Sequence, residues 1–182
     1  MSNYSNYLLA IILIIAAIAL CLVFFLHSSK RKAVGQVKPI SCGNVSVFFD
    51  RTGNVTIIPH VKDKFGQGKA TTDAAFLMMP YTPAKLGSFI RASMEGCKDA
   101  SPCTNRELLE VLGTRDWVGF TADKRNISIH YKENYGIIFN TTRRKTDGTY
   151  EFNYNGMERT LQPDTSDVVL GNTALELLPK CR

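Results

Sequence analysis

The feature that most constrains this chain is a run of nineteen apolar residues near its N-terminus, Leu8 to Leu26 (LLAIILIIAAIALCLVFFL). The run contains no charged residue, proline or glycine. Because an α-helix rises about 1.5 Å per residue, a helix of this length matches the roughly 30 Å hydrocarbon core of a bilayer. A buried core helix usually keeps a polar face, and this segment has none. The run therefore predicts a transmembrane helix at about residues 8–26, within a membrane anchor of residues 1–29.

The flanks of this segment favour a retained anchor over a cleaved signal, and they predict its direction. A secretory signal has a basic first region and a small-residue cleavage site, whereas the segment MSNYSNY carries no charged side chain. Lys30, Arg31 and Lys32 follow the apolar run directly. Because basic residues concentrate on the cytoplasmic side of membrane helices, we expect a single-pass protein whose C-terminal domain lies in the cytoplasm.

The positive charge of the chain is concentrated beside this predicted anchor. Residues 30–38 form a basic stalk, and no acidic residue occurs in residues 1–38. The remaining chain carries 18 basic against 16 acidic side chains, so the net charge of +6 comes mainly from the stalk. We therefore expect no direct binding of nucleic acid by the domain.

The remaining residues, 39–182, have the length of one ordinary domain. Short stretches of alternating apolar and polar residues, bounded by Gly, Asn and Asp, are typical of β-hairpins. One continuous apolar run that ends at Pro80 is typical of a buried strand. The predicted strands are Val45–Phe49, Val55–Ile58, Ile127–Tyr131, Gly136–Asn140, Thr149–Tyr154 and the apolar run, Ala74–Met79.

Three helices are predicted from the residues at their starts. Thr82 and Pro83 supply an N-cap and a proline in the first turn. Thr104 and Glu107 have the spacing of a capping box, and Asp167 is expected to cap the last helix. We expect an α+β domain in which an antiparallel sheet has its helices on one side.

The two halves of the domain resemble each other, which predicts an internal duplication of about residues 40–98 and 122–182. Gly87 and Gly171 stand early in the two predicted helices, where glycine costs about 1 kcal/mol relative to alanine. Their recurrence suggests that a strand approaches each of these helices closely. The matches at an offset of 82 residues are Asn44–Phe49 with Asn126–Tyr131 and Val55–Ile58 with Ile137–Asn140; those at an offset of 84 are Leu86-Gly87 with Leu170-Gly171 and Cys97-Lys98 with Cys181-Arg182.

The reactive side chains of the domain do not suggest catalysis. His60 and His130 lie far apart in the sequence, and His130 is expected on the polar face of a strand, where a surface histidine is common. No C-x-x-C pair occurs, so a zinc site is not expected. Cys97 and Cys103 suit a redox switch or, more typically, two structural thiols. We expect no catalytic residue, no metal and no cofactor; an enzyme that uses His130 is the weaker alternative.

Seven residues are candidates for binding a partner protein. The only tryptophan is either a binding anchor or packed under the edge of the sheet. Acidic side chains on the middle and last helices suit a basic partner such as a nuclease, and a basic turn suits an acidic partner or solvent. The candidates are Glu107, Glu110, Trp117, Asp164, Asp167, Arg143 and Arg144.

The two glycine-containing helix segments make the domain resemble a known family. Leu86-Gly87-Ser-Phe-Ile-Arg-Ala-Ser and Leu170-Gly171-Asn-Thr-Ala-Leu-Glu-Leu look like the helix segments of the immunity proteins of bacterial contact-dependent growth inhibition systems. The likeness covers roughly residues 40–182, and its motifs are short and apolar. It implies a non-enzymatic protein that binds and neutralises a toxin domain delivered by a neighbouring cell. Members share no binding residue that carries over to this chain, and they are typically soluble, which the predicted anchor contradicts.

The predicted function is therefore that of a membrane-tethered immunity protein at the bacterial inner membrane. Its partner would be a cognate toxin domain, a nuclease by analogy only. The alternative is a bitopic envelope protein whose outward-facing domain binds a cell-surface or secretion-system component. In that case the four cysteines after residue 38 are expected to be oxidised.

Overall fold

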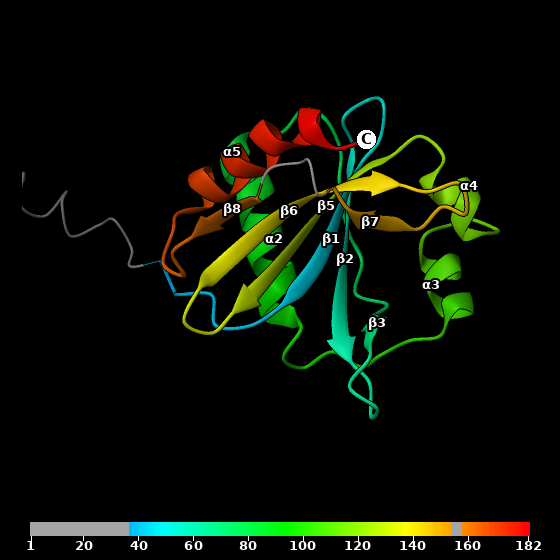
Figure 1. Cartoon of the computed structure of the whole chain (residues 1–182), viewed down its shortest axis with the longest axis horizontal. Helices are drawn as coiled ribbons and strands as arrows, with labels where there is room; N and C mark the ends of the chain where they lie inside the picture. Colours follow the sequence, from blue (N-terminus) through cyan, green and yellow to red (C-terminus); the bar gives the residue numbers. More distant parts are fainter. Residues whose placement is uncertain (1–36, 154–157) are drawn as a thin grey trace, which may run out of the picture. The chain divides into compact units, whose positions relative to one another are not determined.

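Eight strands pair into one antiparallel sheet in the computed structural model, which describes residues 37–153 and 158–182 (Figure 1). The strands are β1 (Asn44–Phe49), β2 (Val55–Lys62), β3 (Gly68–Ala70), β4 (Ala75–Leu77), β5 (Arg125–Lys132), β6 (Gly136–Arg144), β7 (Tyr150–Phe152) and β8 (Glu158–Leu161). The main order is β3-β2-β1-β5-β6-β7, with β4 also paired to β2 and β8 also paired to β6. The helices are α2 (Pro83–Gly96), α3 (Asn105–Val111), α4 (Trp117–Thr121), α5 (Asp167–Leu177) and a 3-10 turn, η1 (Leu178–Lys180).

The two halves of the sheet pair with matching registers. Strand β2 pairs with β4 over Val55–Ile57 and then with β3 over His60–Lys62. Strand β6 pairs with β8 and then with β7 at the positions 82 residues later. At the centre, Ser46 of β1 lies opposite Ser128 of β5, so equivalent residues face each other across an approximate twofold axis. That the halves arose by duplication stays a prediction.

Helices α2 and α5 cover one face of the sheet and bury the main core. Side chains alternate across a strand, so every second residue of the central strands faces these helices. Complete burial of one such aliphatic side chain contributes about 1.5–3 kcal/mol. The fully buried members are Val45, Val47, Ile57, Ile127, Ile129, Ile137 and Phe139 from the strands, with Leu86, Ile90, Met94, Leu170 and Ala174 from the helices.

Two glycines bring the backbones of α2 and α5 into contact. A Cβ atom added at Gly87 would lie 1.8 Å from the carbonyl oxygen of Asp167. One added at Gly171 would lie 1.9 Å from the carbonyl oxygen of Pro83. The expectation that these glycines mark the approach of a strand is therefore wrong, since each one accommodates the first turn of the other helix.

The opposite face of the sheet carries a second, smaller core. Phe48 and Ile58 point away from α2 and α5, and they pack against Leu108 of α3 and Phe120 of α4. The prediction that all helices lie on one side of the sheet is therefore wrong (Figure 1). The physical reason is that strands buried on both faces need cover on both, and α3 and α4 supply the second layer.

The starts of two helices are confirmed by their cap hydrogen bonds. The Thr82 hydroxyl accepts a hydrogen bond from the backbone N–H of Lys85, 3.2 Å away. Thr104 and Glu107 form the predicted capping box in both directions. The local pattern of cap residues was therefore sufficient to place these two helix starts.

Two other boundaries differ from their predictions. The cap of α5 is Ser166, whose hydroxyl accepts from the N–H of Val169, and Asp167 is instead the first helical residue. The predicted buried strand at residues 74–79 shortens to β4, which in the part of the chain that the structure describes pairs only with β2. Phe76 in its centre is 49% exposed, because among the described residues β4 is an edge strand.

The predicted membrane helix at residues 8–26 lies outside the described residues. Across residues 37–153 and 158–182, no helix is both long enough and apolar enough to cross a membrane. The longest helix there, α2, has 14 residues, about 21 Å at 1.5 Å per residue and short of a roughly 30 Å bilayer core. The predictions of a transmembrane fold class and of a single-pass inner-membrane location with a cytoplasmic domain are therefore corrected. The structure supports an α+β domain with a curled antiparallel sheet.

Candidate partner-binding surface

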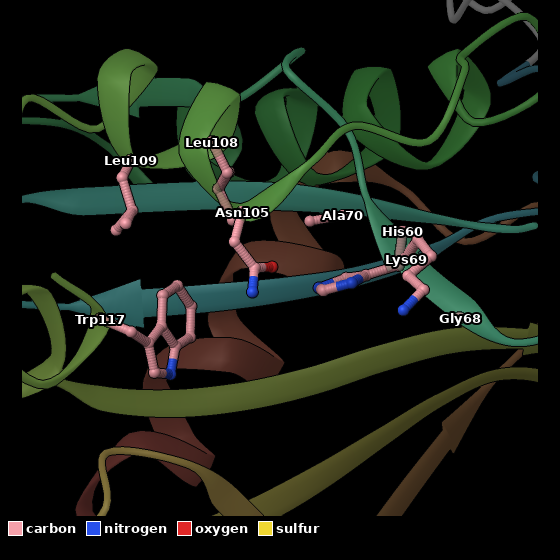
Figure 2. Close-up of a pocket in the computed structure, with 8 residues that line it drawn as sticks. All are labelled: His60, Gly68, Lys69, Ala70, Asn105, Leu108, Leu109 and Trp117. Atoms are coloured by element: carbon pink, nitrogen blue, oxygen red, sulfur yellow. The ribbon is translucent and has the colours of Figure 1, made fainter.

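A groove opens between the β2–β3 hairpin and α3, beside the second core (Figure 2). Its volume is about 420 Å³. In Figure 2 the amide of Asn105 and the ring of His60 extend into the same space, and the indole of Trp117 lies beyond Asn105. Polar and apolar side chains thus meet in one concave region. The lining residues are His60, Gly68, Lys69, Ala70, Asn105, Leu108, Leu109 and Trp117.

Helix α3 forms one wall of the groove and is held at its start by two sets of contacts. The capping box of Thr104 fixes the first turn. The N–H of Cys103 donates to the carbonyl oxygen of Ala70 at 2.9 Å, which ties this turn to β3. Leu108 is buried beneath the helix, whereas Leu109 is half-buried and lines the groove. The wall is therefore fixed to the sheet and still presents an apolar side chain to a partner.

Trp117 forms the end of the groove and also packs under the sheet. The carboxylate of Asp116 accepts from the N–H of Gly119 at 2.7 Å and so starts α4 at this tryptophan. The indole meets the ring of Phe48 edge-on at 5.8 Å and lies 5.3 Å from the ring of Phe120. Trp117 is nevertheless only half-buried. The packing is an observation, and a role for Trp117 in binding stays a prediction.

His60 provides the most enclosed titratable side chain of the groove. Its Nε2 atom lies 3.0 Å from the hydroxyl oxygen of Ser46. Burial lowers the pKa of His60 below its ordinary value of 6.5, so the ring is neutral near pH 7. A second cavity, of about 520 Å³, also touches His60 and contains His130, whose pKa burial lowers as well. Both imidazoles therefore offer hydrogen bonds without adding positive charge.

The β2–β3 hairpin beside the groove ends in an exposed aromatic residue. Phe65 is 76% exposed at the tip. The carboxylate of Asp63 accepts hydrogen bonds from the N–H groups of Phe65 and Gln67, which fixes the turn. The ammonium of Lys64 lies 5.0 Å from the centre of the Phe65 ring. The tip is thus an ordered, basic and partly apolar projection.

The four predicted acidic candidates lie on two separate parts of the domain. Glu107 and Glu110 are on α3 beside the groove, whereas Asp164 and Asp167 lie at the start of α5, the helix that covers the other face. The Asp167 carboxylate accepts from Arg91, with an Nε–Oδ1 distance of 2.6 Å. These acids therefore do not form one patch, and Asp167 has a structural contact within the domain.

The two predicted arginines make contacts inside the domain. Arg143 on β6 forms an ion pair with Glu151 on β7. Arg144 donates to the hydroxyl oxygen of Thr121 and to the carbonyl oxygen of Val118, each at 3.2 Å, and so supports α4. Arg143 is more exposed than its ion-pair partner Glu151. Binding roles for both arginines stay predictions.

Sequence reasoning did not select several residues of this surface. Phe65 stands in Asp63-Lys64-Phe65-Gly66, where an aromatic residue in a hairpin turn was an available signal. Leu109 and Asn105 line the groove only because α3 packs against β3, which the sequence does not reveal. In residues 37–153 and 158–182, no three His, Cys, Asp or Glu side chains meet closely enough to hold a metal ion.

Comparison with known proteins identifies shared folds at low sequence identity. No family of known proteins matches the sequence, and no curated protein does either. A protein of unknown function from Neisseria meningitidis is similar in structure, with a TM-score of 0.61 and 10% identity over 80% of this chain and 98% of that one. A chain of a CdiA-CT/CdiI toxin and immunity complex from Yersinia pseudotuberculosis is also similar, with a TM-score of 0.57 and 11% identity over 80% of this chain and all of that one. At such identities the likeness shows a common fold and nothing finer.

Proposed function

We propose that this chain is an immunity protein that binds and neutralises a cognate contact-dependent growth inhibition toxin domain. The single observation that carries the proposal is the likeness of its fold to a chain of a toxin and immunity complex, over the whole length of that chain. The glycine-containing helix segments that resemble the same family support it independently, since they were found in the sequence alone.

The surface that we propose for the toxin consists of the groove and the β2–β3 hairpin tip. Interface hot spots are usually aromatic or apolar side chains that become fully desolvated by a partner. Phe65 projects at 76% exposure, and Leu109 and Trp117 are half-buried around the groove. Phe65 does not line the groove itself, so a partner that fills the groove and also contacts the hairpin tip would cover these three side chains. Asn105 and neutral His60, which both line the groove, would then supply hydrogen bonds to it.

The charges on this surface suit a partner that offers both signs. Lys62, Lys64 and Lys69 surround the hairpin tip, while Glu107 and Glu110 lie on the outside of α3. Complementary charges at the rim mainly raise the association rate and exclude wrong partners. A basic toxin such as a nuclease would therefore meet α3, and its own acidic residues would meet the hairpin.

We propose that neutralisation proceeds by stoichiometric binding, without chemistry on the toxin. His60 has a hydroxyl neighbour, Ser46, and its pKa is lowered by burial rather than by a charged partner. A general base is usually activated through such a charged partner. This arrangement favours a binding role for the histidine.

The proposal predicts that a toxin domain is encoded beside the gene of this chain, and the test uses the full chain and that toxin domain. The dissociation constant is measured by calorimetry for the unmutated chain, for Phe65→Ala and for Asn105→Arg, which places a longer cation in the groove. Removal of a hot-spot aromatic costs about 2 kcal/mol, or roughly a 30-fold weaker affinity. Phe152→Ala is the matched control, since this phenylalanine is 51% exposed on β7, at the opposite edge of the sheet.

The outcomes separate the function from the surface. If the full chain neither binds nor inhibits the neighbouring toxin, the immunity function is wrong. If it binds and Phe152→Ala weakens affinity more than Phe65→Ala and Asn105→Arg, the function stands and the surface is wrong. His130→Ala should inhibit the toxin as fully as the unmutated chain, with the titration ending at equal amounts of the two proteins; a substoichiometric end point would indicate catalysis instead.

A further inference from the structure

Two cysteines far apart in the sequence meet where the segment before β1 crosses the end of α2. The thiol of Cys42 lies 3.6 Å from the carbonyl oxygen of Met94. The thiol of Cys97 lies 3.4 Å from the carbonyl oxygen of Ser93 and 3.7 Å from that of Asn44. Each sulfur thus lies against a backbone carbonyl that is close in sequence to the other cysteine, since Met94 precedes Cys97 by three residues and Asn44 follows Cys42 by two.

The two backbones touch at this point. A Cβ atom added at Gly43 would lie 2.7 Å from Cα of Met94, so this residue beside Cys42 is packed directly on the last turn of α2. Cys97, one turn beyond Met94, is the C-cap of the same helix. A disulfide requires Cα atoms about 4.4–6.8 Å apart, a condition that only backbones in contact can meet.

Both thiols are accessible to a small reagent. Each cysteine is half-buried, and both line the cavity of about 520 Å³ that also touches His60 and His130. Burial raises the pKa of the Cys42 thiol, and a charged Cys97 raises it further, whereas Lys98 lowers it.

We propose that Cys42 and Cys97 form a disulfide when the protein meets a thiol oxidant such as glutathione disulfide. The deprotonated thiol of one cysteine attacks a sulfur of glutathione disulfide and releases one glutathione thiolate. The thiolate of the other cysteine attacks the mixed disulfide and releases the second glutathione. The two cysteine sulfurs are oxidised and glutathione disulfide is reduced to two thiols, so electrons and protons balance.

The bond would join the segment before β1 to the end of α2. The amide of Tyr131 on β5 donates to the carbonyl oxygen of Gly43 at 2.9 Å, so this segment also holds β5. The proposal goes beyond toxin binding and does not depend on it. Its consequence is a more stable domain under oxidising conditions, with a fixed wall of the cavity beside His60.

The experiment equilibrates the full chain with glutathione disulfide, blocks remaining thiols with N-ethylmaleimide and maps the peptides by mass spectrometry. Cys103→Ser is the control, because Cys103 is also half-buried but lies before α3 on the other face. The expected product is a linked Cys42–Cys97 peptide in the unmutated chain and in Cys103→Ser. Its formation should be faster at higher pH, since burial raises the pKa of Cys42.

Thermal unfolding gives a second readout that does not depend on peptide mapping. Oxidation should raise the Tm by about 5 °C or more, because the bond closes a long loop. Cys42→Ser and Cys97→Ser should show no such rise. The proposal is wrong if Cys42 and Cys97 of the unmutated chain both end as maleimide or single glutathione adducts, or if Cys103 takes part in the linked peptide instead.

Discussion

The contact between α2 and α5 makes the substitution Gly87→Ala a sharp test of the fold. Alanine is the better helix former, and in an open helix the change would stabilise the protein by about 1 kcal/mol. Here the new Cβ would lie 1.8 Å from the carbonyl oxygen of Asp167. Steric overlap and helix propensity therefore predict opposite signs for one substitution.

The expected loss of stability follows from how far the Asp167 carbonyl oxygen must move away from the new Cβ atom of Gly87→Ala. Real Cβ atoms essentially never lie closer than 3.0 Å to such an atom, so the first turn of α5 must move by about 1.2 Å from its 1.8 Å position. Overpacking of a buried contact costs about 1–3 kcal/mol. The obstacle is backbone, which cannot rotate aside, so the cost belongs at the upper end. After the gain in propensity, we expect a net loss of about 2 kcal/mol.

Urea unfolding of the full chain measures this loss, and Gly96→Ala is the control. Gly96 ends the same helix, and an added Cβ there meets nothing within 4 Å. Gly96→Ala should therefore leave the free energy of unfolding unchanged or raise it by up to about 1 kcal/mol. For Gly87→Ala the Tm should fall by roughly 4–8 °C.

A Gly87→Ala protein as stable as the unmutated chain would refute the inferred backbone contact. Gly171→Ala provides a further check, because its Cβ would lie 1.9 Å from the carbonyl oxygen of Pro83 in the reciprocal contact. One separation of the two helices relieves both overlaps. The double substitution should therefore cost less than the sum of the single ones.

Three other contacts give predictions of their own. The guanidinium of Arg91 joins the Asp167 carboxylate to two backbone carbonyls, and a single ammonium cannot replace these contacts. Arg91→Lys should therefore lower the free energy of unfolding by about 1–2 kcal/mol, as measured by urea unfolding. An unchanged urea midpoint would contradict this. Burial lowers the pKa of His60 in the folded chain. Below about pH 6.5 the unfolded chain therefore binds a proton more readily than the folded chain, and the free energy of unfolding should decrease as the pH is lowered. His60→Gln should flatten that dependence between about pH 7.5 and 5.5, and an identical slope would show that other groups cause it. Tyr150→Phe should cost about 1 kcal/mol, because the hydroxyl donates to the Lys124 carbonyl at 2.6 Å. Burial raises the pKa of Tyr150 to about 12. The stabilisation by its neutral phenol is therefore fully present below the ordinary pKa of tyrosine and is lost as the pH rises toward 12. Tyr150→Phe should thus reduce the loss of stability at alkaline pH, measured in a pH titration of unfolding.

Features that depend on a few neighbouring residues could be predicted from the sequence. The caps at Thr82 and Thr104 satisfy N–H groups within their own first turn, so no distant residue is needed to recognise them. The turn at Gly53 was equally local, and its φ of +87° requires glycine. Ser166 shows the limit of this reasoning, because it lies next to an equally suitable cap residue, Asp167.

Features that depend on distant segments could not be predicted in the same way. The apolar residues of β4 resemble those of a central strand, and only the pairing with β2 shows that Phe76 is at an edge. The glycine at position 87 signalled a close approach, yet its sequence context does not tell whether a strand or a helix approaches. For the surface, Trp117 was selected by residue type, whereas Phe65 and Leu109 belong to it through the packing of α3 on β3.

The pairing of Ser46 with Ser128 at the centre of the sheet has a consequence for how the protein is made. Of the strand pairs in the described residues, β1 and β5 in the middle of the sheet are the pair most separated along the chain, so their pairing is highly non-local and should form slowly. During synthesis, β1 emerges and pairs with β2 while its other edge waits for β5. Until then, the apolar side chains of Val45 and Val47 lie along an open strand edge, the kind of surface that aggregates. The nascent first half is therefore the stage at which this open strand edge exposes the chain most to aggregation.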